Sequence, residues 1–73
     1  MAEANWRRLM ESQIMYYGGP LPARVVLEGD PADHSYRTFV ETFAEGRKTR
    51  FQYARYFYGE EQAMADYRGR LGM

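Results

Sequence analysis

The feature that most constrains the fold is an aromatic stretch over residues 35–59, SYRTFVETFAEGRKTRFQYARYFYG. Aromatic and β-branched residues favour strands, and the break at Ala44-Glu45-Gly46 is typical of a hairpin turn. The stretch therefore predicts a long two-stranded hairpin. One face of this hairpin would supply a small core, and the other would carry Arg and Tyr side chains.

The first half of this stretch also allows a helix. Asp30-Pro31 followed by Asp33 is a helix-start signature. The apolar residues that follow have the spacing i, i+3, i+4, i+7, namely Tyr36, Phe39, Val40 and Phe43. We favour a strand because of the composition of residues 38–43 and because residues 50–58 form a good partner strand.

The loop decides which side chains share a face. A three-residue loop with Gly46 in the left-handed region places Phe39 opposite Phe51. A two-residue loop would put Glu45 at positive φ and divide the phenylalanines between the two faces, so we favour the three-residue loop. It predicts an aromatic face of Phe39, Phe43, Phe51, Tyr53 and Phe57. The opposite face would then hold Tyr36, Thr38, Val40, Thr42, Lys48, Arg50, Gln52, Ala54 and Tyr56.

The flanking segments complete the expected fold. Residues 3–17 carry apolar side chains at helical spacing, and Gly18-Gly19-Pro20 would end that helix. Residues 23–28 predict a strand, residues 29–34 a turn, and residues 60–71 a second helix whose end charges complement its dipole. The expectation is one α+β domain over residues 1–73 in the order αβββα. Its three-stranded antiparallel meander would carry both helices on the aromatic face.

Composition limits the function classes. A chain of 73 residues without cysteine builds one small core and has no disulfide or Cys-based zinc site to support it. The ten basic and ten acidic residues cancel, yet residues 35–58 carry five basic against two acidic side chains. We find no signal peptide or membrane-spanning run, which predicts a cytoplasmic protein without membrane association.

The loop and strand from Gly29 to Gly46 resemble the double-stranded RNA-binding domain. Gly29, Pro31 and His34 lead to Val40-Glu41-Thr42 and then to the Gly46 turn, with spacing similar to that family. The resemblance implies an αβββα fold and a role for His34 in an RNA minor groove. In the family, lysines at the start of the second helix hold phosphates, whereas this chain has Glu60 and Glu61 there.

The Arg/Tyr interleaving of residues 50–58 is the main functional signal. Arg and Tyr dominate binding hot spots, although an ordinary strand with solubilising charges has the same pattern. We expect a small non-catalytic protein-binding domain that acts as an inhibitor or adaptor by occluding a macromolecular partner, of the kind that phages and mobile elements encode. The expected partner-binding residues are Tyr36, Lys48, Arg50, Tyr56 and Tyr58.

The alternative is nucleic-acid binding through the same hairpin face, with contacts from His34, Arg47 and Arg55. Catalysis has little support, because the single histidine, His34, lies in a turn and the sequence pattern places no nucleophile beside it. We expect no cofactor and no metal. A homodimer through a sheet edge is also expected, because the Val25-Val26-Leu27 strand carries few charges to discourage pairing.

Overall fold

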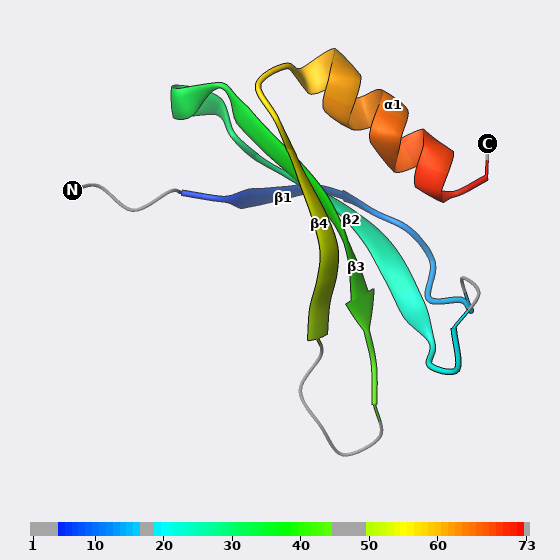
Figure 1. Cartoon of the computed structure of the whole chain (residues 1–73). Coiled ribbons are helices and arrows are strands. Elements are labelled where there is room, and N and C mark those ends of the chain that lie inside the picture. The colour runs from blue at the N-terminus through cyan, green and yellow to red at the C-terminus, as the bar shows by residue number, and fades with distance from the viewer. Residues whose placement is uncertain (1–4, 17–18, 45–49, 73) are drawn as a thin grey trace.

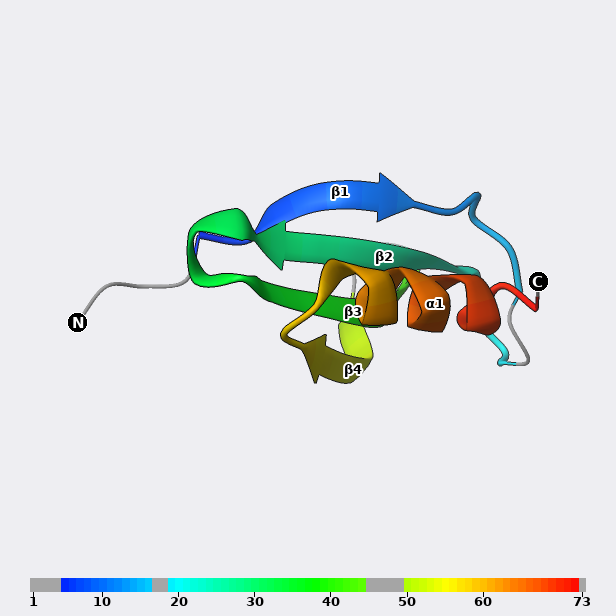
Figure 2. The same cartoon turned by 90° about the horizontal axis from the view of Figure 1, so that it is seen from above.

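The computed structural model describes residues 5–16, 19–44 and 50–72. It has one four-stranded antiparallel sheet in the order β1-β2-β3-β4, followed by a helix that packs on one face of β2, β3 and β4 (Figures 1 and 2). The elements are β1 Arg7–Glu11, β2 Ala23–Asp30, the 3₁₀ turn η1 Pro31–Asp33, β3 Ser35–Thr42, β4 Arg50–Phe57 and α1 Glu60–Arg70.

The expected order αβββα with two helices is wrong. The segment predicted as the first helix contains β1, which pairs with the outer edge of β2. The apolar side chains that suggested a helix are not buried as a stripe, since Leu9, Met10 and Ile14 are all exposed. A short isolated helix is marginal in water, and the backbone hydrogen bonds to β2 stabilise the extended form instead.

The other elements follow the sequence patterns. The hairpin of β3 and β4, the strand β2, the turn at residues 31–33 and the helix α1 are confirmed. Helix α1 begins after Gly59, with Glu60 and Glu61 in its first turn and Arg68 and Arg70 in its last, so its charges suit the helix dipole. The expected Ala44-Glu45-Gly46 loop lies largely outside the described residues.

The main core lies between the sheet and α1. Tyr36, Val25, Leu27, Ala63 and Tyr67 form this cluster. Because side chains alternate along a strand, the odd residues of β2 and the even residues of β3 face the helix. The helix therefore covers the face of Tyr36 and Thr38, and the prediction that it would cover the face of Phe39 is wrong.

A bulge in β4 changes which face its residues occupy. Val40 pairs with Gln52, but Thr38 pairs with Arg55, so β4 has one extra residue between these pairs. Tyr53, at φ 57°, lies in this bulge. Beyond the bulge, Phe57 faces the helix and Tyr56 faces the other side. The predicted grouping of Phe51 and Phe57 on one face is therefore wrong.

The sheet edges also differ from the expectation. Strand β2 lies between β1 and β3, so the Val25-Val26-Leu27 segment is not a free edge. The edges are β1 and β4, and each is interrupted by a bulge. Bulges discourage pairing with another chain.

Candidate binding surface

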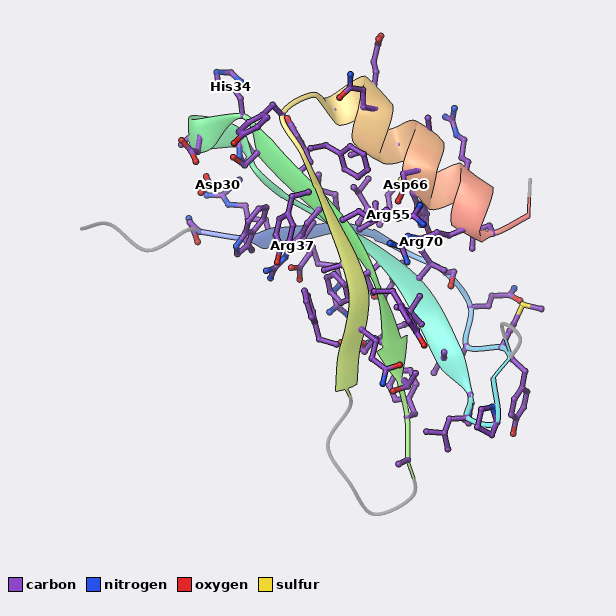
Figure 3. The ribbon with its side chains drawn as sticks, in the orientation of Figure 1. Asp30, His34, Arg37, Arg55, Asp66 and Arg70 are labelled. Atoms are coloured by element: carbon purple, nitrogen blue, oxygen red, sulfur yellow. The ribbon has the colours of Figure 1, made fainter. Side chains whose placement is uncertain are left out.

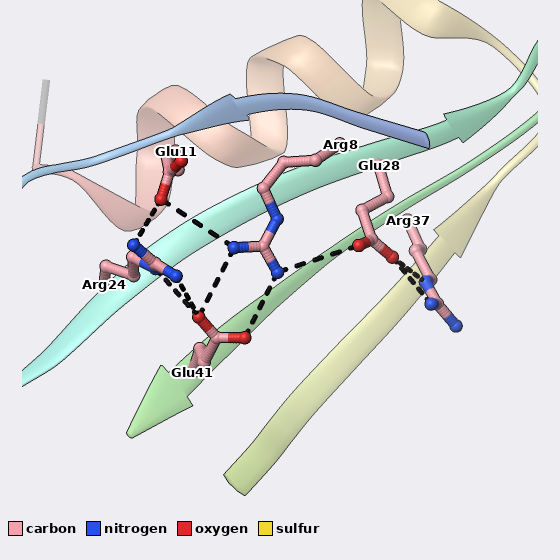
Figure 4. Close-up of polar contacts among 6 residues, drawn as sticks. All are labelled: Arg8, Glu11, Arg24, Glu28, Arg37 and Glu41. Carbon is pink, nitrogen blue, oxygen red and sulfur yellow. Dashed lines mark hydrogen bonds and ion pairs between the residues drawn. The ribbon is translucent and has the colours of Figure 1, made fainter. Parts of the chain in front are cut away.

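The sheet face that α1 leaves uncovered, here called the open face, carries a continuous network of charged side chains. Figure 4 shows this ion-pair network across three strands, with α1 behind the sheet. Its members are Arg8 and Glu11 from β1, Arg24 and Glu28 from β2, and Arg37 and Glu41 from β3.

Arg8 pairs with all three glutamates of the network, and Glu41 pairs with Arg8 and Arg24. Glu41 Oε1 accepts a hydrogen bond from Arg24 Nε at 2.8 Å, and Glu41 Oε2 accepts one from Arg8 Nη2 at 3.1 Å. Arg37 binds Glu28 Oε1 through Nε at 2.8 Å and Nη2 at 2.6 Å. Since three arginines are matched by three glutamates, the network has no net charge.

Two members of the network, Glu41 and Arg8, are held in their charged forms by their neighbours. Burial alone would raise the pKa of Glu41, but hydrogen bonds from Arg8 and Arg24 outweigh it and hold that pKa below its usual value. Burial would likewise lower the pKa of Arg8, yet the hydrogen bond and charge of Glu41 raise it. These partners fix the long arginine side chains in place before any ligand binds.

Aromatic rings surround the Arg37 end of the network. The guanidinium carbon of Arg37 lies 4.3 Å from the Trp6 ring centre and 4.9 Å from that of Phe51. Phe51 stacks on Phe39 with centroids 4.1 Å apart, and Phe39 is only 2% exposed. Tyr56, 62% exposed, lies beside Trp6 with centroids 6.3 Å apart. The open face thus presents rings and fixed guanidinium groups together.

A second polar cluster holds the helix to the sheet on the other face. Asp66 of α1 accepts hydrogen bonds from Thr38 Oγ1 at 2.5 Å, Arg55 Nη1 at 2.6 Å and Arg70 Nε at 3.0 Å (Figure 3). Arg70 Nη2 also donates to the carbonyl oxygen of Tyr53 in the bulge. This Asp66 cluster therefore joins α1 to β3 and to the bulge of β4.

The Asp66 cluster gives a pH dependence that can be measured. Burial would raise the pKa of Asp66, but the bonds from Thr38, Arg55 and Arg70 lower it below its ordinary value. A folded pKa below the unfolded one stabilises the fold above about pH 4, and this contribution is lost as the pH falls through the folded value. We expect Asp66→Asn to reduce the free energy of unfolding by about 1–2 kcal/mol at pH 7, after discounting the exposed Arg55 pair, and by much less at pH 2.5.

Urea unfolding at the two pH values measures this difference. Glu61→Gln, an exposed change in the first turn of the same helix, is the matched control; it loses only a weak interaction with the helix dipole and should cost no more than about 0.5 kcal/mol at pH 7. A cost for Asp66→Asn that stayed the same from pH 7 to pH 2.5 would contradict the assignment.

The predicted partner-binding residues are divided by the fold. Tyr36 is 9% exposed and belongs to the core, so its expected place on an exposed face is wrong. Tyr56 lies exposed on the open face, and Tyr58, just after β4, is 87% exposed. Lys48 and the side chain of Arg50 lie outside the described residues.

The predicted nucleic-acid contacts do not form one site. His34 is exposed in the turn after η1, where its backbone has φ 52°. Arg55 faces the helix side and is bound to Asp66. Arg47 lies outside the described residues. Figure 3 shows His34 at the η1 end of the sheet, away from the Arg55–Asp66 pair.

Sequence reasoning missed most of the open face. Trp6, Arg8 and Glu11 were assigned to a helix, and the charges of β2 and β3 were not considered together. A signal was present, because opposite charges four residues apart occur in both strands, at Arg24 and Glu28 and at Arg37 and Glu41. Residues four apart share one face of a strand.

Within residues 5–16, 19–44 and 50–72, no group of three or more His, Cys, Asp or Glu side chains is placed to hold a metal ion. No helix in these same ranges has the length and apolar character needed to cross a membrane. Comparison with models of known protein families, with curated proteins and with solved structures finds no match for this chain.

Proposed function

We propose that this protein is a non-catalytic protein-binding module that acts as an inhibitor or adaptor by covering part of a partner with its open face. The observation that carries the proposal is the group of rings beside the ion-pair network, in which Tyr56 and Phe51 are exposed and Trp6 is half-buried. Trp, Tyr and Arg are the residues most enriched among binding hot spots, and here Trp6, Tyr56 and Arg37 lie side by side.

Pre-organisation supports the proposal. Ordering a flexible side chain on binding costs about 0.5–1.5 kcal/mol. The arginines of the open face are already held by glutamates, so a partner would lose little of its binding free energy to this cost. Such a surface is stiff before the partner arrives.

The charge pattern of the open face favours a protein partner over a polyanion. Nucleic-acid affinity comes mainly from basic side chains that displace counterions from phosphates. On the open face, Arg8, Arg24 and Arg37 are each paired with carboxylates, and phosphates would meet those carboxylates at close range. A protein surface, with both signs of charge, does not meet this repulsion.

Nucleic-acid binding is the second candidate, because two observations favour it. The Arg37 guanidinium lies among three rings, those of Trp6, Phe39 and Phe51, and bases stack on such groups. The hairpin sequence also has the excess of basic residues noted above. Salt dependence distinguishes this candidate from the first.

The test uses a random 12-residue peptide library displayed against the immobilised protein, followed by affinity measurements on a selected peptide. We expect Tyr56→Ala to weaken that affinity about tenfold or more, since an exposed central tyrosine contributes on this scale. Tyr53→Asn is the matched control, because Tyr53 is also highly exposed but lines a cavity on the helix side. It should bind like the wild type.

A 20-residue oligothymidine is titrated in parallel between 50 and 200 mM salt. Tight binding with a steep salt dependence, lost in Tyr56→Ala, would assign the open face to nucleic acid and overturn the protein-binding proposal. Equal binding of the selected peptide to Tyr56→Ala and to the wild type would also count against it.

A further inference from the structure

An aromatic pocket opens where β3 begins and β4 ends. It has a volume of about 230 Å³ and is lined by Trp6, Ser35, Tyr36, Tyr56, Phe57 and Tyr58. Five of these six residues are aromatic. Tyr36 and Phe57 pack against the main core, whereas Tyr56 and Tyr58 are exposed. The pocket therefore has a fixed inner part and an accessible rim.

The lining of the aromatic pocket is uncharged. None of the described residues that line it carries an ionisable acid or base of the Asp, Glu, Lys or Arg type. Its polar groups include the indole N–H of Trp6 and the hydroxyls of three tyrosines, all of which can donate a hydrogen bond. The complementary ligand is apolar and offers hydrogen-bond acceptors.

A cationic ligand fits less well. Aromatic pockets often bind ammonium groups, but the Trp6 ring already carries the Arg37 guanidinium at 4.3 Å. No carboxylate among the described lining residues would balance a second cation. Arg37 is itself neutralised by Glu28, so the site as a whole favours a neutral group.

The pocket is small, with a volume of about 230 Å³, and it fits side chains of a peptide segment. Proline suits it best, because its ring is compact and apolar and its nitrogen has no proton to leave unpaired. Proline-rich segments are also extended before they bind, which lowers the entropy lost on docking to aromatic grooves.

We infer that the aromatic pocket receives a proline-containing, extended segment of the partner. The inference rests on the proposed protein-binding function and names the partner class. The tyrosine hydroxyls and the indole N–H would donate to the peptide carbonyls, and Tyr56 joins the pocket to the rest of the open face.

Trp6 provides a direct test, because it is the only tryptophan of the chain and lines the pocket. Its fluorescence is followed while decaproline, and separately a water-soluble ten-residue peptide that alternates alanine with serine, is added to the full chain. We expect a saturable change with decaproline and at least tenfold weaker binding of the alanine–serine peptide. Tyr58→Ala, a change at an exposed residue, should weaken decaproline binding at least about tenfold, and Tyr53→Asn should not change it.

The other outcomes overturn the inference. A fluorescence change with a trimethyllysine peptide but not with decaproline would identify a cation site. If decaproline has no effect while a library-selected peptide still requires Tyr56, the partner class is wrong and the protein-binding function stands. If neither kind of peptide depends on Tyr56 or Tyr58, both proposals fail.

Discussion

Phe39→Ala is expected to lower the free energy of unfolding by about 3–5 kcal/mol, the usual cost of removing a buried aromatic ring. Phe39 lies on the open face, yet it is one of the most buried side chains of the molecule. It is covered by the Phe51 ring and flanked by the Arg37 guanidinium, 5.6 Å from its centre. Domains of this size are stable by only about 4–11 kcal/mol, so the variant should be close to unfolding at 37 °C.

Urea titration followed by circular dichroism measures this loss. Phe51→Ala is the matched control, because Phe51 covers the same ring from outside and is 47% exposed. It should cost only about 1 kcal/mol. A loss at Phe39 no larger than at Phe51 would show that the open face has no buried layer of its own.

The buried layer beneath the open face matters for function as well as for stability. Val26 and Phe39 are opposite each other in β2 and β3, and both are buried although no helix lies above them. Side chains of the open face cover them, Phe51 and Arg37 over Phe39. Val26 and Phe39 are thus shielded from water before any partner binds. A partner would contact the rings and fixed charges that cover them.

The elements that could be predicted are those with a local signal. Alternating β-branched and aromatic residues define β3 and β4, and the charges at both ends of α1 mark its boundaries. Strand β1 has no such signal, because all five of its residues are exposed. Its backbone pairs with β2, and Arg8 forms ion pairs with Glu28 and Glu41, which lie 20 and 33 residues further along the chain.

The face of each aromatic residue was harder to predict. Gly and Asn are the residues that most often adopt a left-handed backbone, so the sequence at Tyr53 gives no signal of a bulge. The bulge is held by Arg70 and by the Asp66 cluster, which form only when α1 has packed on the sheet. It moves Tyr56 onto the open face beside Trp6. The Arg/Tyr pattern predicts the exposure of Tyr56 and Tyr58, but it does not predict the pocket that they form with Trp6.

Gly29→Val is expected to reduce the free energy of unfolding by about 3 kcal/mol, the upper part of the range for overpacking. Gly29 pairs with Tyr36 across β2 and β3, and the Tyr36 ring lies directly over it. A Cβ at this position would be 2.8 Å from Tyr36 Cδ1 and 2.9 Å from Leu9 Cδ1. Since Tyr36 is packed in the core with Leu27 and Tyr67, its ring can move only by disturbing that core.

Gly69→Ala is the control for the loss of a glycine, because an added Cβ there meets nothing within 4 Å. In a helix this change should stabilise the protein by about 0.5–1 kcal/mol. The two glycines should therefore respond with opposite sign in the same urea titration.

Combining Gly29→Val with Tyr36→Leu should cost less than the sum of the two single changes, because a leucine leaves room where the tyrosine ring lay. Additive costs would mean that Gly29 and Tyr36 are not in contact, and the inner wall of the aromatic pocket would then lack the support that holds the Tyr36 ring in place.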